Sequence, residues 1–179
     1  KRITGHKVKL RGAGRTDSGV HAICQVANFK TLSKLALNKI KDADLILHAG
    51  DLVNLSVIER LKSIAPVKAV WGNMDDSKVK KQLKQKEIIE LDGVTIGLMH
   101  GWGSPNNLIA VLKNEFKNDK VDIIIFGHSH NPINTKLEDI LFFNPGSLTD
   151  TFFSNYASYG GIRINKNKYS AKIEKLQEG

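Results

Sequence analysis

The chain has 179 residues, of which 41% are apolar and 25% charged, a composition typical of one globular domain with its own core. No apolar run approaches about 18 residues, and no long apolar stretch follows the basic amino terminus, so neither a membrane span nor a secretory signal is expected. These two expectations predict a cytoplasmic location. The single cysteine, Cys24, excludes an internal disulfide and a cysteine-rich metal site and is compatible with a reducing compartment.

The net charge of +9 is unevenly distributed along the chain. Residues 1–31 hold seven lysines and arginines against one acid, Asp17, which gives +6 and leaves +3 for the other 148 residues. Because basic segments attract anionic partners, RNA is a candidate partner for this segment. The motifs described below favour a small substrate instead.

The basic segment also carries a dense motif. Residues 12–22 read Gly-Ala-Gly-Arg-Thr-Asp-Ser-Gly-Val-His-Ala, and Gln-Val-Ala-Asn-Phe occupies residues 25–29. This stretch resembles the active-site segment of the tRNA pseudouridine synthase A family, in which the aspartate matching Asp17 is catalytic. Nothing after residue 31 continues the resemblance, so a scaffold role is favoured over pseudouridylation. Catalysis by Asp17 remains the alternative hypothesis.

From residue 31 onward the apolar pattern alternates between helical and strand periods. Helices are expected over 32–40, 53–64, 78–86 and 106–116. Strands are expected over 43–51, 67–75, 87–91, 94–101, 121–126, 140–147, 159–164 and 169–176. The lysine-rich run over 78–86 is interpreted as the solvated face of a short helix rather than an RNA-binding patch, because Val79 and Leu83 are spaced i, i+4.

Five polar residues stand just past predicted strands: Asp51, Asn73, His100, His128 and His130. Ligands bind outside the carboxyl ends of strands in open α/β sheets, so these residues are candidate metal ligands. A carboxylate, an amide oxygen and three imidazoles suit Mn²⁺, Fe²⁺, Ni²⁺, Co²⁺ or Zn²⁺ better than Ca²⁺. His48, inside a predicted strand, is interpreted as a packed, hydrogen-bonded histidine.

In the order Gly-Asp, Gly-Asn-x-Asp, His-Gly and Gly-His-x-His, these motifs resemble the calcineurin-like metallophosphoesterase superfamily. Residues 72–75, 99–103 and 144–147 are most similar to its small prokaryotic phosphodiesterase branch, and the resemblance covers residues 31–165. It implies an α/β fold in which two mixed β-sheets pack face to face with helices on the outside.

The resemblance also implies a site with two divalent metal ions. Asp51 would bridge the ions, His130 would belong to the first metal, and the remaining candidates, Asn73, His100 and His128, would complete the shell of the second. The implied reaction is hydrolysis of a small phosphodiester by a metal-bridging hydroxide. Met74 occupies the position of a histidine that assists the leaving group in many members, so substrates with good leaving groups are expected.

One motif of the superfamily is missing, because the sequence contains no Asp-x-His. We expect one domain over 1–179, in which 1–30 is a foreign, pseudouridine-synthase-like segment that replaces the first strand and its loop. If residues 8–13 form that strand, Asp17 and His21 could supply ligands; if residues 23–29 form it, Asn28 stands where the aspartate belongs. The second alternative is favoured because it carries less charge.

Either alternative weakens the first metal site, so phosphodiesterase activity could be reduced. A non-catalytic metal-binding or RNA-binding module is the further alternative. Nothing in the sequence specifies an oligomeric state.

Overall fold

The computed structural model describes residues 22–27, 40–148 and 156–176. Asp17, His21, Asn28 and most of the helix expected over 32–40 lie outside these residues. The first sheet has the strand order β10 (Lys168–Lys175), β9 (Ser158–Asn165), β1 (Ala22–Ala27), β2 (Leu45–His48), β3 (Val67–Ala69). The second has the order β4 (Lys86–Leu91), β5 (Val94–Met99), β6 (Ile123–Ile125), β8 (Ile140–Asn144), β7 (Ile133–Leu137).

Both sheets are mixed, as the resemblance to the superfamily implies. In the first, β1, β2 and β3 run parallel, while β9 is antiparallel to both β1 and β10. In the second, β5, β6 and β8 run parallel and the edge strands β4 and β7 are antiparallel to them. Because parallel strands end at the same edge of a sheet, the loops after β2 and β3 start together, as do those after β5 and β6.

The central strand of the first sheet comes from the segment that resembles a pseudouridine synthase. β1 lies between β9 and β2, with Cys24 opposite Leu45 and Ala27 opposite His48. This strand lies within residues 23–29 apart from Ala22, as the favoured alternative predicts; residues 8–13 lie outside the described chain. The carboxyl end of β1 therefore lies at the edge of the sheet where β2 ends.

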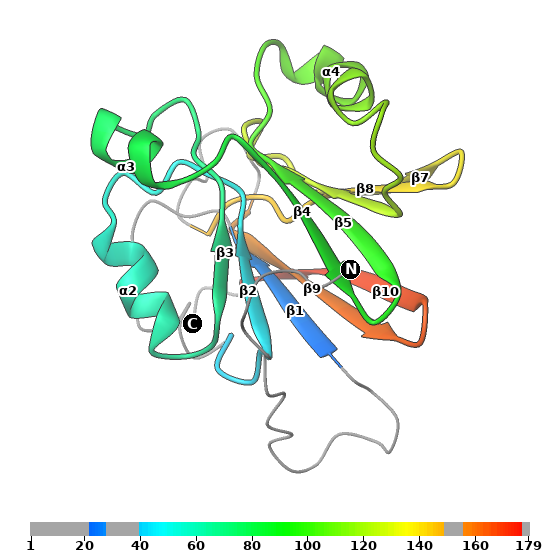
Figure 1. The fold of residues 1–179 in the computed structure, drawn as a ribbon, viewed down its shortest axis with the longest axis horizontal. Helices are drawn as coiled ribbons and strands as arrows, with labels where there is room; N and C mark the ends of the chain where they lie inside the picture. Colours follow the sequence, from blue (N-terminus) through cyan, green and yellow to red (C-terminus); the bar gives the residue numbers. More distant parts are fainter. Residues whose placement is uncertain (1–21, 28–39, 149–155, 177–179) are drawn as a thin grey trace.

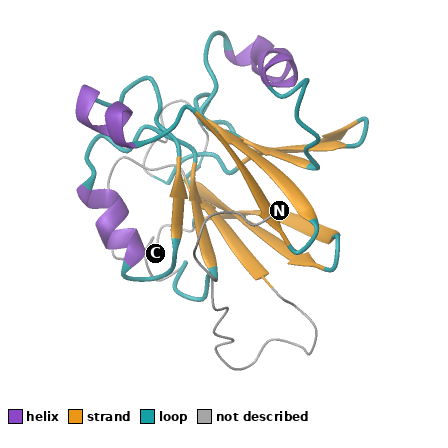
Figure 2. Ribbon diagram, viewed as in Figure 1, coloured by secondary structure: helices purple, strands orange, loops and turns teal. Residues whose placement is uncertain are grey.

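The sheets pack face to face, with helices on the outer faces (Figures 1 and 2). Leu47, Ile125 and Phe143 are fully buried members of the core cluster between the sheets. Ile46 faces the other way, toward α2 (Ser56–Lys62) and α3 (Ser77–Gln82), which cover the first sheet. The second sheet is covered by α4 (Leu108–Glu115), preceded by the short 3₁₀ helix η1 (Pro105–Asn107). No helix among the described residues has the length and apolarity needed to span a bilayer.

Strand β6 explains why the run Ile123-Ile124-Ile125-Phe126 is continuously apolar. Ile123 and Ile125 belong to the core between the sheets, whereas Ile124 and Phe126 pack with Leu112 of α4. Successive side chains of a strand point to opposite faces, so a strand covered on both sides needs apolar residues at every position.

Three boundary predictions and one omission need correction. The strands expected over 43–51 and 67–75 end earlier, at His48 and Ala69, because their polar ends form the loops of the site. The helix expected from residue 53 begins at Ser56, since Val53 has a positive φ of 62°. Strand β7 was not predicted, because it is an edge strand whose residues after Ile133 are exposed and largely polar.

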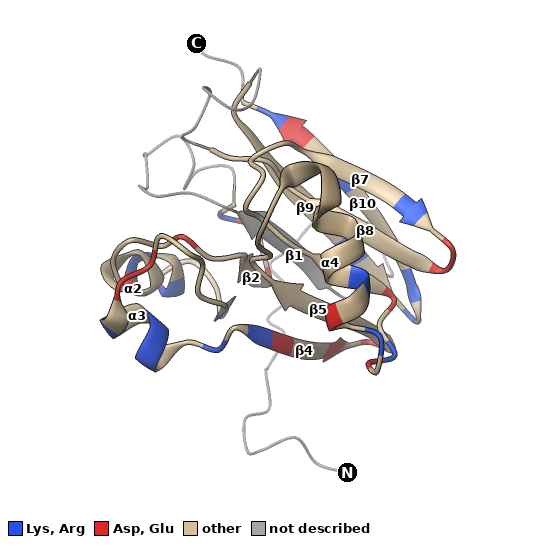
Figure 3. Cartoon of the chain, turned by 90° about the horizontal axis from the view of Figure 1, so that it is seen from above, with Lys and Arg blue, Asp and Glu red and all other residues tan. Residues whose placement is uncertain are grey.

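The first part of the lysine-rich run forms the short helix α3. In α3 Val79 is buried, while Lys78, Lys80 and Lys81 are exposed. Figure 3 shows this basic helix beside β4, along which acidic and basic residues are mixed. The interpretation as a short helix is confirmed for residues 78–82, but the helix ends earlier than expected, since Leu83 is extended and Lys86 begins β4.

Candidate metal centre

Four of the five predicted ligand residues come from loops at the ends of two strands in each sheet. Asp51 follows β2 and Asn73 follows β3, whereas His100 follows β5 and His128 follows β6. Hydrogen bonds and short contacts connect these four side chains, which we call the donor cluster. The cluster therefore joins the two sheets.

The amide oxygen of Asn73 lies at the centre of the donor cluster. Its Oδ1 atom is 3.0 Å from Nε2 of His100 and 3.1 Å from Nδ1 of His128. The Nε2 atom of His100 is also 3.4 Å from Oδ2 of Asp51. Two atoms that bind one ion at about 2.0–2.2 Å are separated by roughly 2.9–3.5 Å, between octahedral and tetrahedral geometry. Each of these three pairs therefore has the spacing of two donors that share an ion.

Backbone carbonyls orient both imidazoles of the cluster. Nδ1 of His100 donates to the carbonyl of Ala49 over 2.6 Å, and Nε2 of His128 donates to that of Gly103 over 2.9 Å. Because a carbonyl only accepts, the other nitrogen of each neutral ring carries a lone pair that faces Asn73 Oδ1. Histidines that bind metals usually donate their second ring nitrogen in this way. Lone pairs that face one another repel unless a cation or a proton lies between them.

The two imidazoles pack edge to face, with ring centroids 5.4 Å apart and planes at 80°. Burial lowers the pKa of His100, and the nearby Asp51 carboxylate opposes this by favouring the charged ring. The result favours the neutral imidazole, which is the form that binds metals.

The carboxylate of Asp75, which was not predicted as a site residue, holds the loop that carries Asp51. Its Oδ2 accepts from the backbone N–H of Asp51 at 3.0 Å and of Gly72 at 2.7 Å, and its Oδ1 accepts from Val53 at 2.8 Å. The backbone N–H of Met74 donates to Oδ1 of Asp51 over 2.9 Å. Asp75 belongs to the Gly-Asn-x-Asp motif, but its spacing from Asn73 gave no indication that it would bind the loop after another strand.

Unusual backbone conformations also concentrate at this site. Among the described residues other than glycine, those with positive φ outside the hairpin turns are Asp51, Val53, His128 and His130, at 57–63°. Valine in this region is strained, because its branched side chain crowds the backbone. Such strain gathers at functional sites, where the surrounding contacts hold the backbone in place.

The loop after β6 is held by the buried side chain of Asn144. Its Nδ2 donates to the carbonyl of Gly127 at 2.8 Å and to Oγ of Ser129 at 3.1 Å, while its Oδ1 accepts from Gly146 at 3.0 Å. This network explains the Asn-Pro-Gly-Ser motif over 144–147 as support for the loop. His130, partly buried, lies in the same loop two residues beyond His128.

The described residues contain no group of three His, Cys, Asp or Glu side chains close enough to hold a metal ion. The polar contact between His100 and His128 within the donor cluster runs through Asn73, because its amide oxygen is the neighbour that both imidazoles share. His48 lies inside β2, is fully buried, and accepts a hydrogen bond at Nδ1 from the N–H of Gly50 over 3.2 Å. The interpretation of His48 as a packed, hydrogen-bonded histidine is confirmed.

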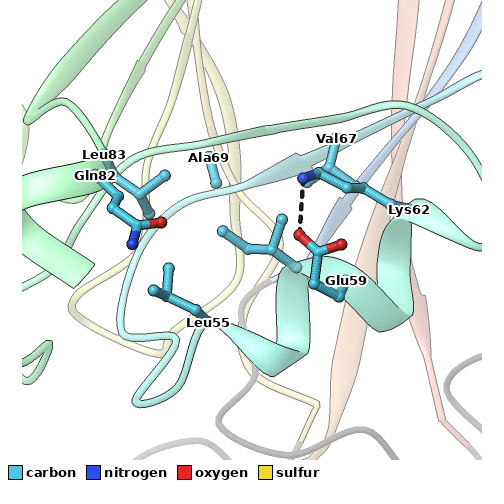
Figure 4. Close-up of a pocket in the computed structure, with 8 residues that line it drawn as sticks. Leu55, Glu59, Lys62, Val67, Ala69, Gln82 and Leu83 are labelled. Carbon is cyan, nitrogen blue, oxygen red and sulfur yellow. Dashed lines mark hydrogen bonds and ion pairs between the residues drawn. The ribbon is translucent and has the colours of Figure 1, made fainter. Parts of the chain in front are cut away.

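A cavity of about 140 Å³ adjoins the donor cluster. It is lined by Trp71, Asn73, Gln85, Met99, His100, Gly101 and Trp102. A second cavity, of about 240 Å³, lies between α2, β3 and the end of α3, with the ion pair of Glu59 and Lys62 among its lining residues (Figure 4). No member of the donor cluster lines this second cavity, so the first is the one relevant to chemistry at the cluster.

Comparison with known proteins assigns the family. The model of the calcineurin-like phosphoesterase superfamily domain matches residues 18–167. The chain belongs to this superfamily. A probable metallophosphoesterase from Methanothermobacter thermautotrophicus is 32% identical over 142 residues, which cover 79% of this chain and 81% of the relative. A phosphodiesterase from Methanocaldococcus jannaschii is 26% identical over 72% of this chain and 81% of its own length.

Solved structures show the same fold. The solution structure of a Thermotoga maritima protein aligns with a TM-score of 0.68 and 30% identity, covering 87% of this chain and 99% of that one. A zinc complex of Vps29 from Entamoeba histolytica aligns with a TM-score of 0.67 and 23% identity, covering 86% and 98%. Metallophosphoesterases of this superfamily use divalent metal ions.

The second resemblance is also found, over a short segment. A tRNA pseudouridine synthase A from a Thermoanaerobacter species is 58% identical over 40 residues, which cover 22% of this chain and 16% of that enzyme. The match therefore includes only a small part of a pseudouridine synthase. Asp17, its candidate catalytic residue, lies outside the described residues.

Proposed function

We propose that this phosphoesterase family member hydrolyses small phosphodiesters with the help of divalent metal ions at the donor cluster. The observation that carries the proposal is the orientation of the two imidazoles. Backbone carbonyls of Ala49 and Gly103 direct one unprotonated nitrogen of each ring toward Asn73 Oδ1, beside the Asp51 carboxylate. This arrangement of lone pairs is suited to a cation.

The donor types favour a borderline ion. An amide oxygen, a carboxylate and two imidazoles fit Mn²⁺, Ni²⁺, Fe²⁺, Co²⁺ or Zn²⁺, and the related Vps29 structure contains zinc. Asp51, Asn73, His100 and His128 would hold the second metal. The first metal would keep Asp51 and His130 but lacks the Asp-x-His pair, so we expect that ion to bind weakly.

When bound, divalent ions would activate water and neutralise the phosphoryl oxygens. The residues of this chain orient the substrate around them. Nζ of Lys80 lies 3.3 Å from the carbonyl of Asn73 and places a positive charge beside the cluster, which favours an anionic substrate. The thioether of Met74, which is 59% exposed, has no proton to give to a leaving group, so esters with good leaving groups should react fastest.

Chelation tests the dependence on metal. Hydrolysis of bis(p-nitrophenyl) phosphate should disappear with a chelator and return when Mn²⁺ or Ni²⁺ is restored. The control is Asn73→Ala, which should stay inactive after the same addition because the shared neighbour of both imidazoles is gone. Activity that resists the chelator, or an Asn73→Ala protein as active as the wild type, would contradict the proposal.

RNA binding by residues 1–31 is a separate proposal that rests on their charge of +6. The logarithm of the affinity for tRNA should fall linearly with the logarithm of the salt concentration. Removal of the positive charges should make this slope less steep. A slope unchanged by neutralising these lysines and arginines would refute it. The cytoplasmic location and the origin of 1–30 as a foreign segment also remain predictions from the sequence.

A further inference from the structure

The cavity beside the donor cluster is lined by both tryptophans of the chain. Trp71 follows β3 of the first sheet and Trp102 follows β5 of the second, so each sheet contributes one aromatic wall. Asn73 and His100 line the same cavity. A molecule inside it would therefore touch the tryptophans and the donor cluster together.

The loop that carries Trp102 holds this side chain at the cavity. Trp102 is 39% exposed, and it lies between Gly101 and Gly103, whose φ values of 87° and 85° are rare for residues with a side chain. The carbonyl of Gly103 accepts the hydrogen bond from His128. The same loop thus orients a candidate metal ligand and holds an indole at the cavity.

The size and chemistry of the cavity fit one aromatic ring. Its volume is about 140 Å³. An apolar protein cavity of about 150 Å³ can take up benzene. Tryptophan walls attract a further ring by stacked or edge-to-face contacts. Nζ of Lys80 lies 5.4 Å from the ring centroid of Trp71, so a positive charge lies near this wall of the cavity.

We propose that this cavity binds a single-ring aromatic group of the phosphodiester substrate while the phosphoryl group lies at the donor cluster. The inference rests on the proposed function and narrows its substrate class to aryl or pyrimidine-bearing phosphodiesters. Trp71 and Trp102 are then specificity residues, since they contact the ring and not the reacting bond.

The test compares two non-hydrolysable ligands that differ only in the ring. In the presence of Zn²⁺, phenylphosphonate should bind about tenfold more tightly than methylphosphonate by isothermal titration calorimetry, the gain expected for stacking one ring. Trp102→Ala should remove this advantage, so that the two ligands bind with similar affinities. Leu137→Ala, which removes a similarly exposed apolar side chain from β7, should preserve it.

Fluorescence gives a second readout, because Trp71→Phe and Trp102→Phe each leave one tryptophan. Phenylphosphonate should change the emission of both variants and methylphosphonate of neither. Equal affinities for the two ligands, or an advantage that survives in Trp102→Ala, would overturn the cavity assignment while leaving the proposed function intact. If neither ligand binds with metal present, the proposed function fails and this inference fails with it.

Discussion

At the scale of single residues, the site depends on side chains that hold other side chains and loops in place. Asp75 accepts three backbone N–H groups and so connects the loop after β2 with the loop after β3. Each of these loops carries one oxygen donor of the cluster, Asp51 or Asn73. The positions of both oxygens therefore depend on a carboxylate that contacts neither imidazole in the hydrogen-bond network.

Replacing Asp75 with asparagine tests this role. The amide keeps one acceptor oxygen, so at least one buried N–H loses its partner, at a cost of about 1–3 kcal/mol. Denaturant unfolding should show this loss, and metal affinity should fall about 10–100-fold. Asp76→Asn is the matched control, because Asp76 caps α3 and asparagine caps helices equally well. Equal effects of the two substitutions would contradict the role of Asp75.

Removal of a direct ligand should have a larger effect. Asp51→Asn and His128→Ala should each weaken metal binding by more than the roughly 100-fold upper range for supporting residues. Elemental analysis after dialysis measures the metal that remains. Asp139→Asn, which removes an exposed carboxylate between β7 and β8, should retain the wild-type content. Wild-type metal content in Asp51→Asn or His128→Ala would show that the ligand assignment is wrong.

At the scale of elements, the ends of parallel strands decide which loops meet. Ala27 of β1 pairs with His48 of β2, so the residues after both strands emerge at one edge. Asp51 is a member of the donor cluster, and Asn28 immediately follows β1. The expectation that position 28 supplies a ligand of the first metal stays a prediction from the sequence, because Asn28 lies outside the described residues.

Restoring the missing motif tests this placement. The wild type should bind one metal tightly and a second weakly, and its titration should be biphasic. Asn28→Asp combined with Lys30→His should produce two tight sites and raise turnover, because the proposed chemistry needs both ions. The comparison protein is Asp17→Ala with His21→Ala, which should leave the biphasic titration unaltered. The assignment of position 28 would be wrong if the double mutant kept the metal stoichiometry and turnover of the wild type. It would also be wrong if the variant without Asp17 and His21 bound less metal.

At the scale of the whole molecule, the donor cluster connects two sheets that also meet through an apolar core and through polar contacts such as the ion pair of Lys68 with Glu87. Asp51 and Asn73 come from the first sheet, and His100 and His128 come from the second. An ion that binds all four residues can bind only the folded state, because unfolding separates the four loops. Metal binding should therefore stabilise the entire fold.

The stabilisation of the fold by metal depends on the free metal concentration relative to Kd. At a free metal concentration of about 100 times Kd, the free energy of unfolding should rise by about 2.7 kcal/mol. For a chain of this length that corresponds to an increase in Tm of roughly 5–10 °C. Calorimetry with and without Zn²⁺ measures the shift, and His128→Ala should abolish it. A wild-type Tm that does not respond to metal would contradict a site between the sheets.

The sequence by itself determined the sheet-forming segments and the identity of the polar residues after them. The run over 123–126 indicated a strand covered on both faces, and the alternation of helix and strand indicated an α/β fold. These features are local, because the period of the apolar residues along a segment depends only on which of its side chains face a core. The same local pattern missed β7, whose exposed edge imposes no apolar alternation.

Only the tertiary structure decided how the loops meet. Asp75 and Asp51 are 24 residues apart, and Asn73 and His128 are 55 apart, so no spacing in the sequence predicts their contacts. Sheet pairing and the packing of two sheets bring these loops together. The hydrogen bonds from His100 to Ala49 and from His128 to Gly103 likewise join distant segments. The sequence therefore predicts the donor types, whereas their orientation depends on long-range packing.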